Sequence, residues 1–107
     1  MLIASLAFRV RSFKRAEAFS TVEALVGQMR SAAGCTRSRF LVDADDENAV
    51  LIASEWLDSA AADAFFRARG FRILRGIRIL MRDELQIVFD DVQARVERAT
   101  ATSVSRF

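Results

Sequence analysis

Alternating apolar and polar positions predict four strands in this chain. Residues 2–10 alternate, with every second side chain apolar, and residues 48–56 form a run that predicts a strand buried on both faces. Two further strands are predicted, one at residues 36–43 and one from residue 83 or 84 to residue 92. The acidic stretch 43–48 is rich in turn-forming residues, so we expect it to join the second and third strands as a hairpin.

Apolar residues at helical spacing predict three helices between these strands. The segment Ser20-Thr-Val-Glu23 has the form of a capping box and predicts the start of the first helix, which Gly34 ends in a left-handed conformation. Residues 58–69 form the second helix, and Gly70 is expected to break it. Residues 71–81 then form a short third helix with arginines opposite its apolar side.

The order strand, helix, strand, strand, helix, short helix, strand predicts an α+β fold of the ferredoxin-like βαββαβ type. Its four-stranded antiparallel sheet has helices on one face, and residues 1–92 form the domain. Residues 93–107 lose periodicity and are expected to be a C-terminal tail, either a frayed helix or an arm that packs on a dimer partner. Because the other face of the sheet is too apolar to remain in water, we expect a homodimer through the sheet faces, with a pocket between each sheet and its own helices.

Composition fits a single domain without a membrane span. The chain has 107 residues, of which 52% are hydrophobic, and its mean hydropathy is +0.17. No apolar run approaches the roughly 20 residues that cross a bilayer. No basic segment precedes the apolar start, which argues against a signal peptide. The single cysteine, Cys35, suits a reducing compartment, so we expect a cytoplasmic location and interpret Cys35 as a packed side chain rather than an activated thiol.

The charged residues restrict the possible chemistry. Sixteen basic and fourteen acidic side chains give a net charge of +2, which is too balanced to favour nucleic acid. Histidine is absent, which removes the commonest general base near neutral pH and the commonest transition-metal ligand. We therefore expect no cofactor and no metal.

Three stretches carry a resemblance to a known family: Met29-Arg-Ser-Ala-Ala-Gly-Cys35, Ile52-Ala-Ser-Glu-Trp56, and Asp58-Ser-Ala-Ala-Ala-Asp-Ala-Phe65. Together they resemble the antibiotic biosynthesis monooxygenase-like family of dimeric α/β barrels, over roughly residues 2–92. Members of this family include oxygenases that act on quinols and polyketide-derived phenols without metal or flavin, haem-degrading enzymes, and proteins without known activity.

The resemblance implies a pocket beside Trp56. There Trp56 would form a pocket wall or position the substrate ring and oxygen, and we take it as the candidate catalytic residue. Its alternative role is structural, as part of the core. The substrate-binding candidates are apolar side chains near it, which are also plausible core residues: Ile52, Phe40, Phe65, Phe66 and Phe71.

Several expected polar residues are missing from this sequence. Haem-degrading relatives carry an axial histidine in the region that is Phe65-Phe66 here, so haem degradation by their scheme is not expected. The asparagine and tyrosine of phenol-oxidising relatives fall on Ile52 and Ala62. Their arginine about twenty residues after the tryptophan is matched by Arg75 or Arg78, but a helical wheel places both on the polar face of the third helix.

Two functional hypotheses follow. The first is a cofactor-independent monooxygenase acting on a small quinol- or anthrone-like aromatic substrate in an apolar pocket. The alternative is a non-catalytic homodimer that binds a hydrophobic ligand or serves a structural or stress-related role. A polar side chain inside the pocket would favour the first hypothesis, because a phenolic proton needs an acceptor and the resulting anion needs a stabilising charge.

Overall fold

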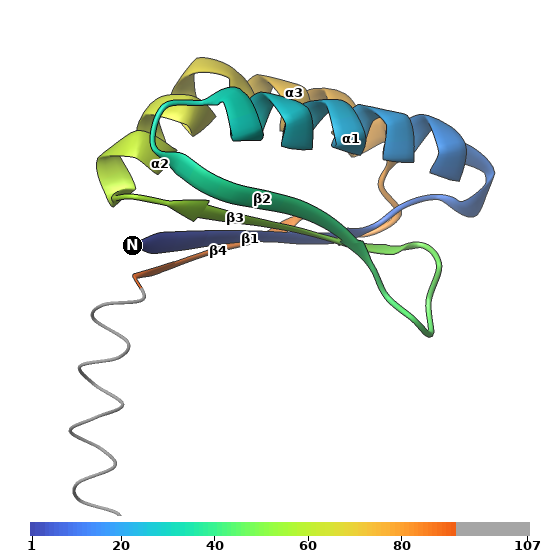
Figure 1. The fold of residues 1–107 in the computed structure, drawn as a ribbon. Coiled ribbons are helices and arrows are strands. Elements are labelled where there is room, and N and C mark those ends of the chain that lie inside the picture. The colour runs from blue at the N-terminus through green and yellow to red at the C-terminus, as the bar shows by residue number, and fades with distance from the viewer. Residues whose placement is uncertain (92–107) are drawn as a thin grey trace, which may run out of the picture.

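A computed structural model describes residues 1–91 of the chain, and these form one antiparallel sheet with helices on one of its faces (Figure 1). The strands are β1 (Leu2–Arg9), β2 (Cys35–Val42), β3 (Ala49–Trp56) and β4 (Gln86–Asp91). The α-helices are α1 (Arg15–Ser31), α2 (Ser59–Phe65) and α3 (Phe71–Ile77). Short turns of other helix types lie at Ser12–Lys14 (3-10), Phe66–Gly70 (π) and Arg78–Leu80 (3-10). None of the described helices is long and apolar enough to cross a membrane.

The sheet has the strand order β2-β3-β1-β4, with every neighbouring pair antiparallel. Leu6 of β1 pairs with Ile52 on one side and with Ile87 on the other, so these three side chains point to the same face. This arrangement confirms the predicted ferredoxin-like α+β fold.

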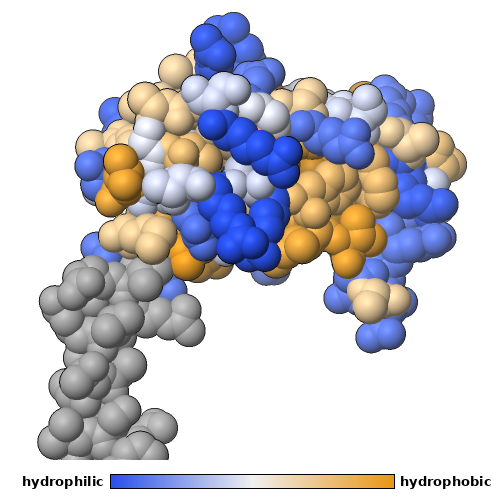
Figure 2. All heavy atoms as spheres, viewed as in Figure 1, coloured by the Kyte–Doolittle hydropathy of each residue, from blue (hydrophilic) through white to orange (hydrophobic). Residues whose placement is uncertain are grey.

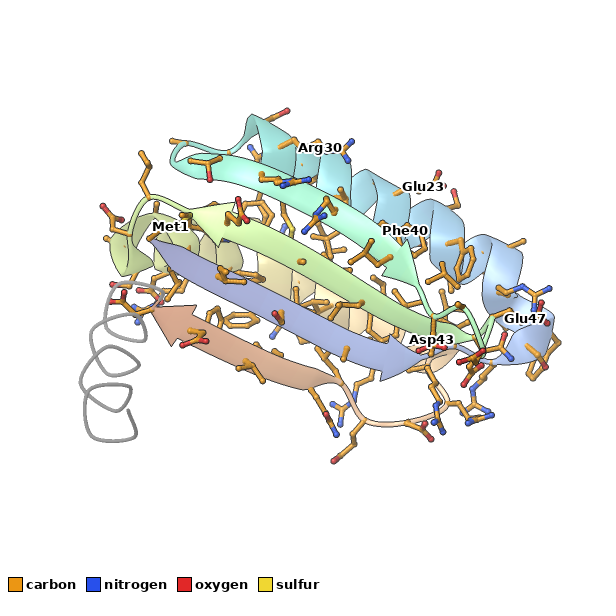
Figure 3. The ribbon with its side chains drawn as sticks, turned by 60° about the horizontal axis from the view of Figure 1, so that its bottom comes forward. Met1, Glu23, Arg30, Phe40, Asp43 and Glu47 are labelled. Carbon is orange, nitrogen blue, oxygen red and sulfur yellow. The ribbon has the colours of Figure 1, made fainter. Side chains whose placement is uncertain are left out.

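The core lies between the sheet and the helices. Alternate residues of the two central strands are buried there: Leu2, Ala4, Leu6 and Phe8 of β1, and Val50, Ile52, Ser54 and Trp56 of β3. The opposite face, turned forward in Figure 3, has no described helix in front of it. On this open face Leu41, Leu51 and Val88 are 39%, 36% and 58% exposed. In the isolated chain, β3 is therefore fully buried on one face only, and the expectation of burial on both faces is wrong for the single subunit.

The predicted capping box is also wrong. Helix α1 begins at Arg15, directly after the 3-10 turn, so Ser20 lies inside the helix rather than at its start. The Arg15 guanidinium contacts the β2–β3 hairpin, 2.7 Å from a carboxylate oxygen of Glu47 and 3.3 Å from the Asn48 side-chain oxygen. These long-range contacts fix the first turn of α1, and no local sequence pattern reveals them.

Gly70 does not end the second helix. Its backbone is right-handed helical, with φ −59° and ψ −49°, and the chain passes through it from the π-helical turn into α3. Gly70 is buried, and a Cβ at this position would lie 2.6 Å from the Phe66 ring. The glycine is needed because the helix packs against two phenylalanine rings here, not because the chain must turn.

Other local predictions are confirmed. Gly34 follows α1 with φ +84°, in the left-handed region, and a Cβ there would meet the Ala61 side chain at 2.5 Å. The β2–β3 hairpin is closed by the Asp43 carboxylate, which accepts hydrogen bonds from the backbone N–H groups of Asp45 and Asp46.

On the side of α1 and β2, hydrophobic side chains gather beneath α1 toward the hairpin end (Figure 2). The predicted tail at 93–107 lies outside the described residues.

Candidate functional site

Trp56 is fully buried at the end of β3, opposite Leu2 of β1 and Cys35 of β2. Its indole Nε1–H donates a hydrogen bond of 2.9 Å to the hydroxyl of Ser54, which is buried as well. The Ser54 hydroxyl in turn donates to the Ala4 carbonyl at 3.4 Å. Because the indole N–H already has a buried partner, it is not directed at a ligand.

Trp56 belongs to an aromatic cluster that includes three of the predicted binding residues. Its ring centroid lies 5.4 Å from that of Phe65 and 6.2 Å from that of Phe66. Phe66 extends the cluster, because its centroid lies 5.6 Å from that of Phe71 and 5.6 Å from that of Phe89. The β4 residue Phe89, which the sequence reasoning missed, thus joins this group.

The other two predicted binding residues lie elsewhere. Phe40 packs edge-on against Phe19 of α1, with ring centroids 5.0 Å apart, and Ile52 is fully buried beside it across the β2–β3 pair. Phe40 lies toward the hairpin end of β2, whereas Met1 marks the opposite end of the sheet (Figure 3). The two therefore belong to the core beneath α1 and do not join the Trp56 cluster.

A cavity lies between α3 and β4, and we call it the α3–β4 cavity. Its volume is about 780 Å³, within the usual range for small-molecule sites. It is lined by Phe71, Leu74, Arg75, Arg78, Met81, Arg82, Asp83, Glu84, Leu85 and Ile87. Of the residues predicted to bind substrate, Phe71 alone appears in this lining, and Trp56 does not.

The α3–β4 cavity combines an apolar wall with arginine side chains. Among residues 1–91, neither Arg75 nor Arg78 takes part in an ion pair. Asp83 differs, because one carboxylate oxygen lies 3.6 Å from Arg9 and the other lies 3.8 Å from Arg82. The cavity therefore presents two guanidinium groups that can pair with an anionic ligand while apolar side chains cover its rings.

The helical wheel correctly separated residues 71–81 into an apolar and a polar side but did not locate the cavity. Leu74 and Ile77 are buried, and Arg75 and Arg78 are exposed, as the pattern predicts. The two arginines nevertheless line the cavity because it opens to solvent along the boundary between the apolar and polar sides of the segment. Their spacing of about twenty residues from Trp56 was the sequence signal that pointed to them.

Cys35 does not have the environment of a reactive thiol. Partial burial raises the pKa of the Cys35 thiol above its ordinary value, and this outweighs the opposing effects of the Arg37 backbone and the charge of Arg30. The interpretation of Cys35 as a packed side chain is therefore supported.

Comparison with known proteins places this fold in a family. Residues 1–74 match the antibiotic biosynthesis monooxygenase family. A crystal structure of an antibiotic biosynthesis monooxygenase superposes with a TM-score of 0.77 and 23% identity, covering 85% of this chain and 97% of that chain. A conserved protein from Methanosarcina mazei Go1 superposes with a TM-score of 0.78 and 17% identity, covering 83% and 89%.

A curated relative matches a shorter stretch. It is a Natronomonas pharaonis protein named "Putative heme-binding protein", which is 35% identical over 65 residues. That match covers 61% of this chain but only 11% of the relative, so the chain spans about a tenth of its length. Because the family match extends over most of the chain, the chain belongs to the antibiotic biosynthesis monooxygenase family.

Proposed function

We propose that this protein is a cofactor-independent monooxygenase that oxidises a small anthrone- or quinol-like aromatic compound in the α3–β4 cavity. The observation that carries the proposal is the pair Arg75 and Arg78, which have no ion-pair partner among residues 1–91 and line the cavity together with apolar side chains. Membership of a family in which some members are named monooxygenases agrees with it.

The cavity supplies what such a reaction requires from the protein. Leu74, Met81 and Ile87 contact the aromatic rings, and this apolar surface strengthens the attraction between an anion and the guanidinium groups. Arg75 and Arg78 stabilise the negative charge that appears when the substrate loses a proton. Trp56 lies in the core and does not line this cavity.

The chemical step needs oxygen as its only co-reactant. Glu84 accepts the proton, because it lines the cavity and forms no ion pair within residues 1–91, whereas Asp83 already contacts two arginines. The substrate anion transfers one electron to oxygen, and the two radicals combine as a peroxide anion. Glu84 returns its proton to this anion, and loss of water then leaves a carbonyl group. For anthrone the balance is one anthrone plus one O2 giving one anthraquinone plus one H2O.

A haem role does not fit the residues of this cavity. Haem iron takes histidine, cysteine, methionine or tyrosine as axial ligands, and the sequence contains neither histidine nor tyrosine. Cys35 is at the start of β2 and does not line the cavity. Among the residues that line the cavity, Met81 is therefore the one that could serve as an axial ligand. We therefore do not carry over the haem binding named for the Natronomonas relative.

The working unit is a homodimer that pairs the open faces of two sheets. Leu51 lies on that face beside Leu41 of β2 and is 36% exposed, and Val88 of the edge strand β4 is a further exposed apolar side chain there. Leaving this surface in water is costly, at roughly 25 cal/mol per Å² of apolar area. Members of the family commonly form dimers, which agrees with this arrangement.

The test is oxygen uptake by metal-free protein with anthrone as the substrate. We expect uptake above the spontaneous rate, and a decrease of about 10- to 100-fold in kcat/KM for Arg75→Ala and Arg78→Ala. Arg72→Ala is the matched control, because Arg72 is an exposed arginine of the same helix that does not line the cavity. Equal losses in all three variants, or no uptake above the spontaneous rate, would contradict the proposal.

The alternative function is a ligand-binding dimer without catalysis. The buried Trp56 indole, whose N–H is already bonded to Ser54, favours it because it removes one donor that could have acted on substrate or oxygen. Saturable binding of anthrone without oxygen uptake, by protein that is folded and dimeric, would establish this alternative.

A further inference from the structure

A second, smaller hollow lies next to the α3–β4 cavity, and Phe71 is the residue that lines both. The second hollow has a volume of about 270 Å³ and is formed where α2 faces the first residues of β1 and the end of β4. Its lining is Leu2, Ser59, Ala60, Ala62, Asp63, Phe66, Phe71 and Phe89. Within residues 1–91 no other residue is shared by the two linings, so the two spaces meet at Phe71.

The π-helical turn sets the position of Phe71. Its backbone N–H donates to the carbonyl of Phe66, five residues earlier, so the Phe71 side chain lies above that of Phe66. The two ring centroids are 5.6 Å apart. The missing Cβ of Gly70 leaves room for this contact, because a Cβ would come within 2.6 Å of the Phe66 ring.

The two rings differ in freedom. Phe66 is 1% exposed and is held by contacts with Trp56, Phe65 and Phe89. Phe71 is 40% exposed, and among the described residues its one ring contact is with Phe66. The Phe71 side chain can therefore be shortened without leaving a buried void, whereas its support cannot.

The two spaces also differ in charge. The α3–β4 cavity has Arg75 and Arg78, whereas the Asp63 carboxylate in the second hollow is paired with Arg67 at 3.1 Å. An anionic group is stabilised at the arginines, and an uncharged ring end suits the apolar second hollow. One elongated ligand could occupy both spaces only by passing the Phe71 ring.

We propose that Phe71 determines substrate length by closing the α3–β4 cavity against the second hollow, so that the native protein accepts aromatic anions that end at this ring. This inference rests on the proposed function for the class of ligand, an aromatic anion. Removing the Phe71 ring joins the two spaces and allows a longer fused-ring anion to extend from the arginines into the apolar second hollow.

The test compares two aromatic acids that share a carboxylate and differ in length by one fused ring. Calorimetric titration gives the dissociation constants of naphthalene-2-carboxylate and anthracene-2-carboxylate for the wild type, Phe71→Ala and Phe71→Val. We expect Phe71→Ala to shift the affinity ratio toward the longer acid by roughly tenfold. Phe71→Val is expected to shift the affinity ratio in the same direction by a smaller factor. If the alanine variant does not fold, the affinity ratio of the valine variant provides the test.

The matched control is Ile79→Ala, because Ile79 follows on the same helical segment, is 78% exposed and lines neither space. An unchanged affinity ratio in both Phe71 variants, or an equal shift in Ile79→Ala, would overturn the role of Phe71. That result would leave the proposed function unaffected. Failure of the wild type and the Phe71 variants to bind either acid would overturn the ligand class, and the role of Phe71 with it. Absence of oxygen uptake, with the expected ratios observed, would remove the proposed reaction and leave the role of Phe71 intact.

Discussion

The strand end at Trp56 and the cavity between α3 and β4 lie close together in the fold but differ in kind. At the first, an indole with no exposed surface is surrounded by aromatic rings and hydrogen-bonded to Ser54. At the second, a space of about 780 Å³ is bordered by Arg75 and Arg78, which have no ion-pair partner in residues 1–91. The comparison teaches that the most distinctive residue of a sequence can lie in the core, while less distinctive residues nearby line a cavity.

The largest expected effect is at the packed region. Trp56→Ala removes a fully buried indole and should lower the free energy of unfolding by about 3–5 kcal/mol, measured by urea denaturation. Trp56→Phe keeps most of the volume and should fold, with anthrone binding close to that of the wild type. A folded Trp56→Phe variant that no longer binds ligand would show that the indole itself contacts the ligand.

The sequence predicted the sheet better than the helices. The strands are defined by alternation, which the burial of Leu6 and Ile52 on one face enforces, and Gly34 has the left-handed conformation expected of it. The start of α1 was missed because Arg15 is held by hairpin residues more than thirty positions away. Gly70 was misread because a glycine required for close packing looks the same in a sequence as one required for a turn.

The candidate site was predicted only in part. Phe65, Phe66 and Phe71 do gather around Trp56, since they follow it closely on one helical segment. Phe40 and Ile52 lie nearer the other end of the sheet, a separation that depends on strand register. The catalytic role of Trp56 stays a prediction.

A second, smaller effect tests the packing between these two regions. Gly70→Ala places a methyl group 2.6 Å from the Phe66 ring and should lower the free energy of unfolding by about 1–3 kcal/mol. Gly76→Ala in α3 is the control, because nothing lies within 4 Å of the added Cβ. Alanine there should stabilise the helix by roughly 0.5–1 kcal/mol. Equal changes in the two variants would contradict the close approach at Gly70.

The dimer can be tested at the open face of the sheet, away from both regions. Leu51→Arg introduces a charge on the apolar face and should convert the protein to monomers. Analytical ultracentrifugation measures the mass, and Leu57→Arg, at a position 65% exposed outside the sheet, is the control. A dimer that persists in Leu51→Arg would place the interface elsewhere.

The smallest expected effect concerns Cys35. Because burial raises the pKa of its thiol in the folded state, the unfolded chain loses this proton first as pH rises above the ordinary value of 9.0. The contribution of Cys35 to stability is therefore full below that pH and is lost as pH rises through the folded pKa. Alkylation by iodoacetamide at pH 8 should be slower than that of glutathione. A faster reaction would indicate an activated thiol.

The most direct test of the central claim, that ligand binds in the α3–β4 cavity through Arg75 and Arg78, is calorimetric titration of naphthalene-2-carboxylate. The proteins compared are the wild type, the double variant Arg75→Ala/Arg78→Ala and the control Arg72→Ala. We predict a loss of at least roughly tenfold in affinity for the double variant and little change for the control. Unchanged affinity in the double variant, with wild-type binding that Trp56→Phe abolishes, would contradict the account and return the site to the tryptophan.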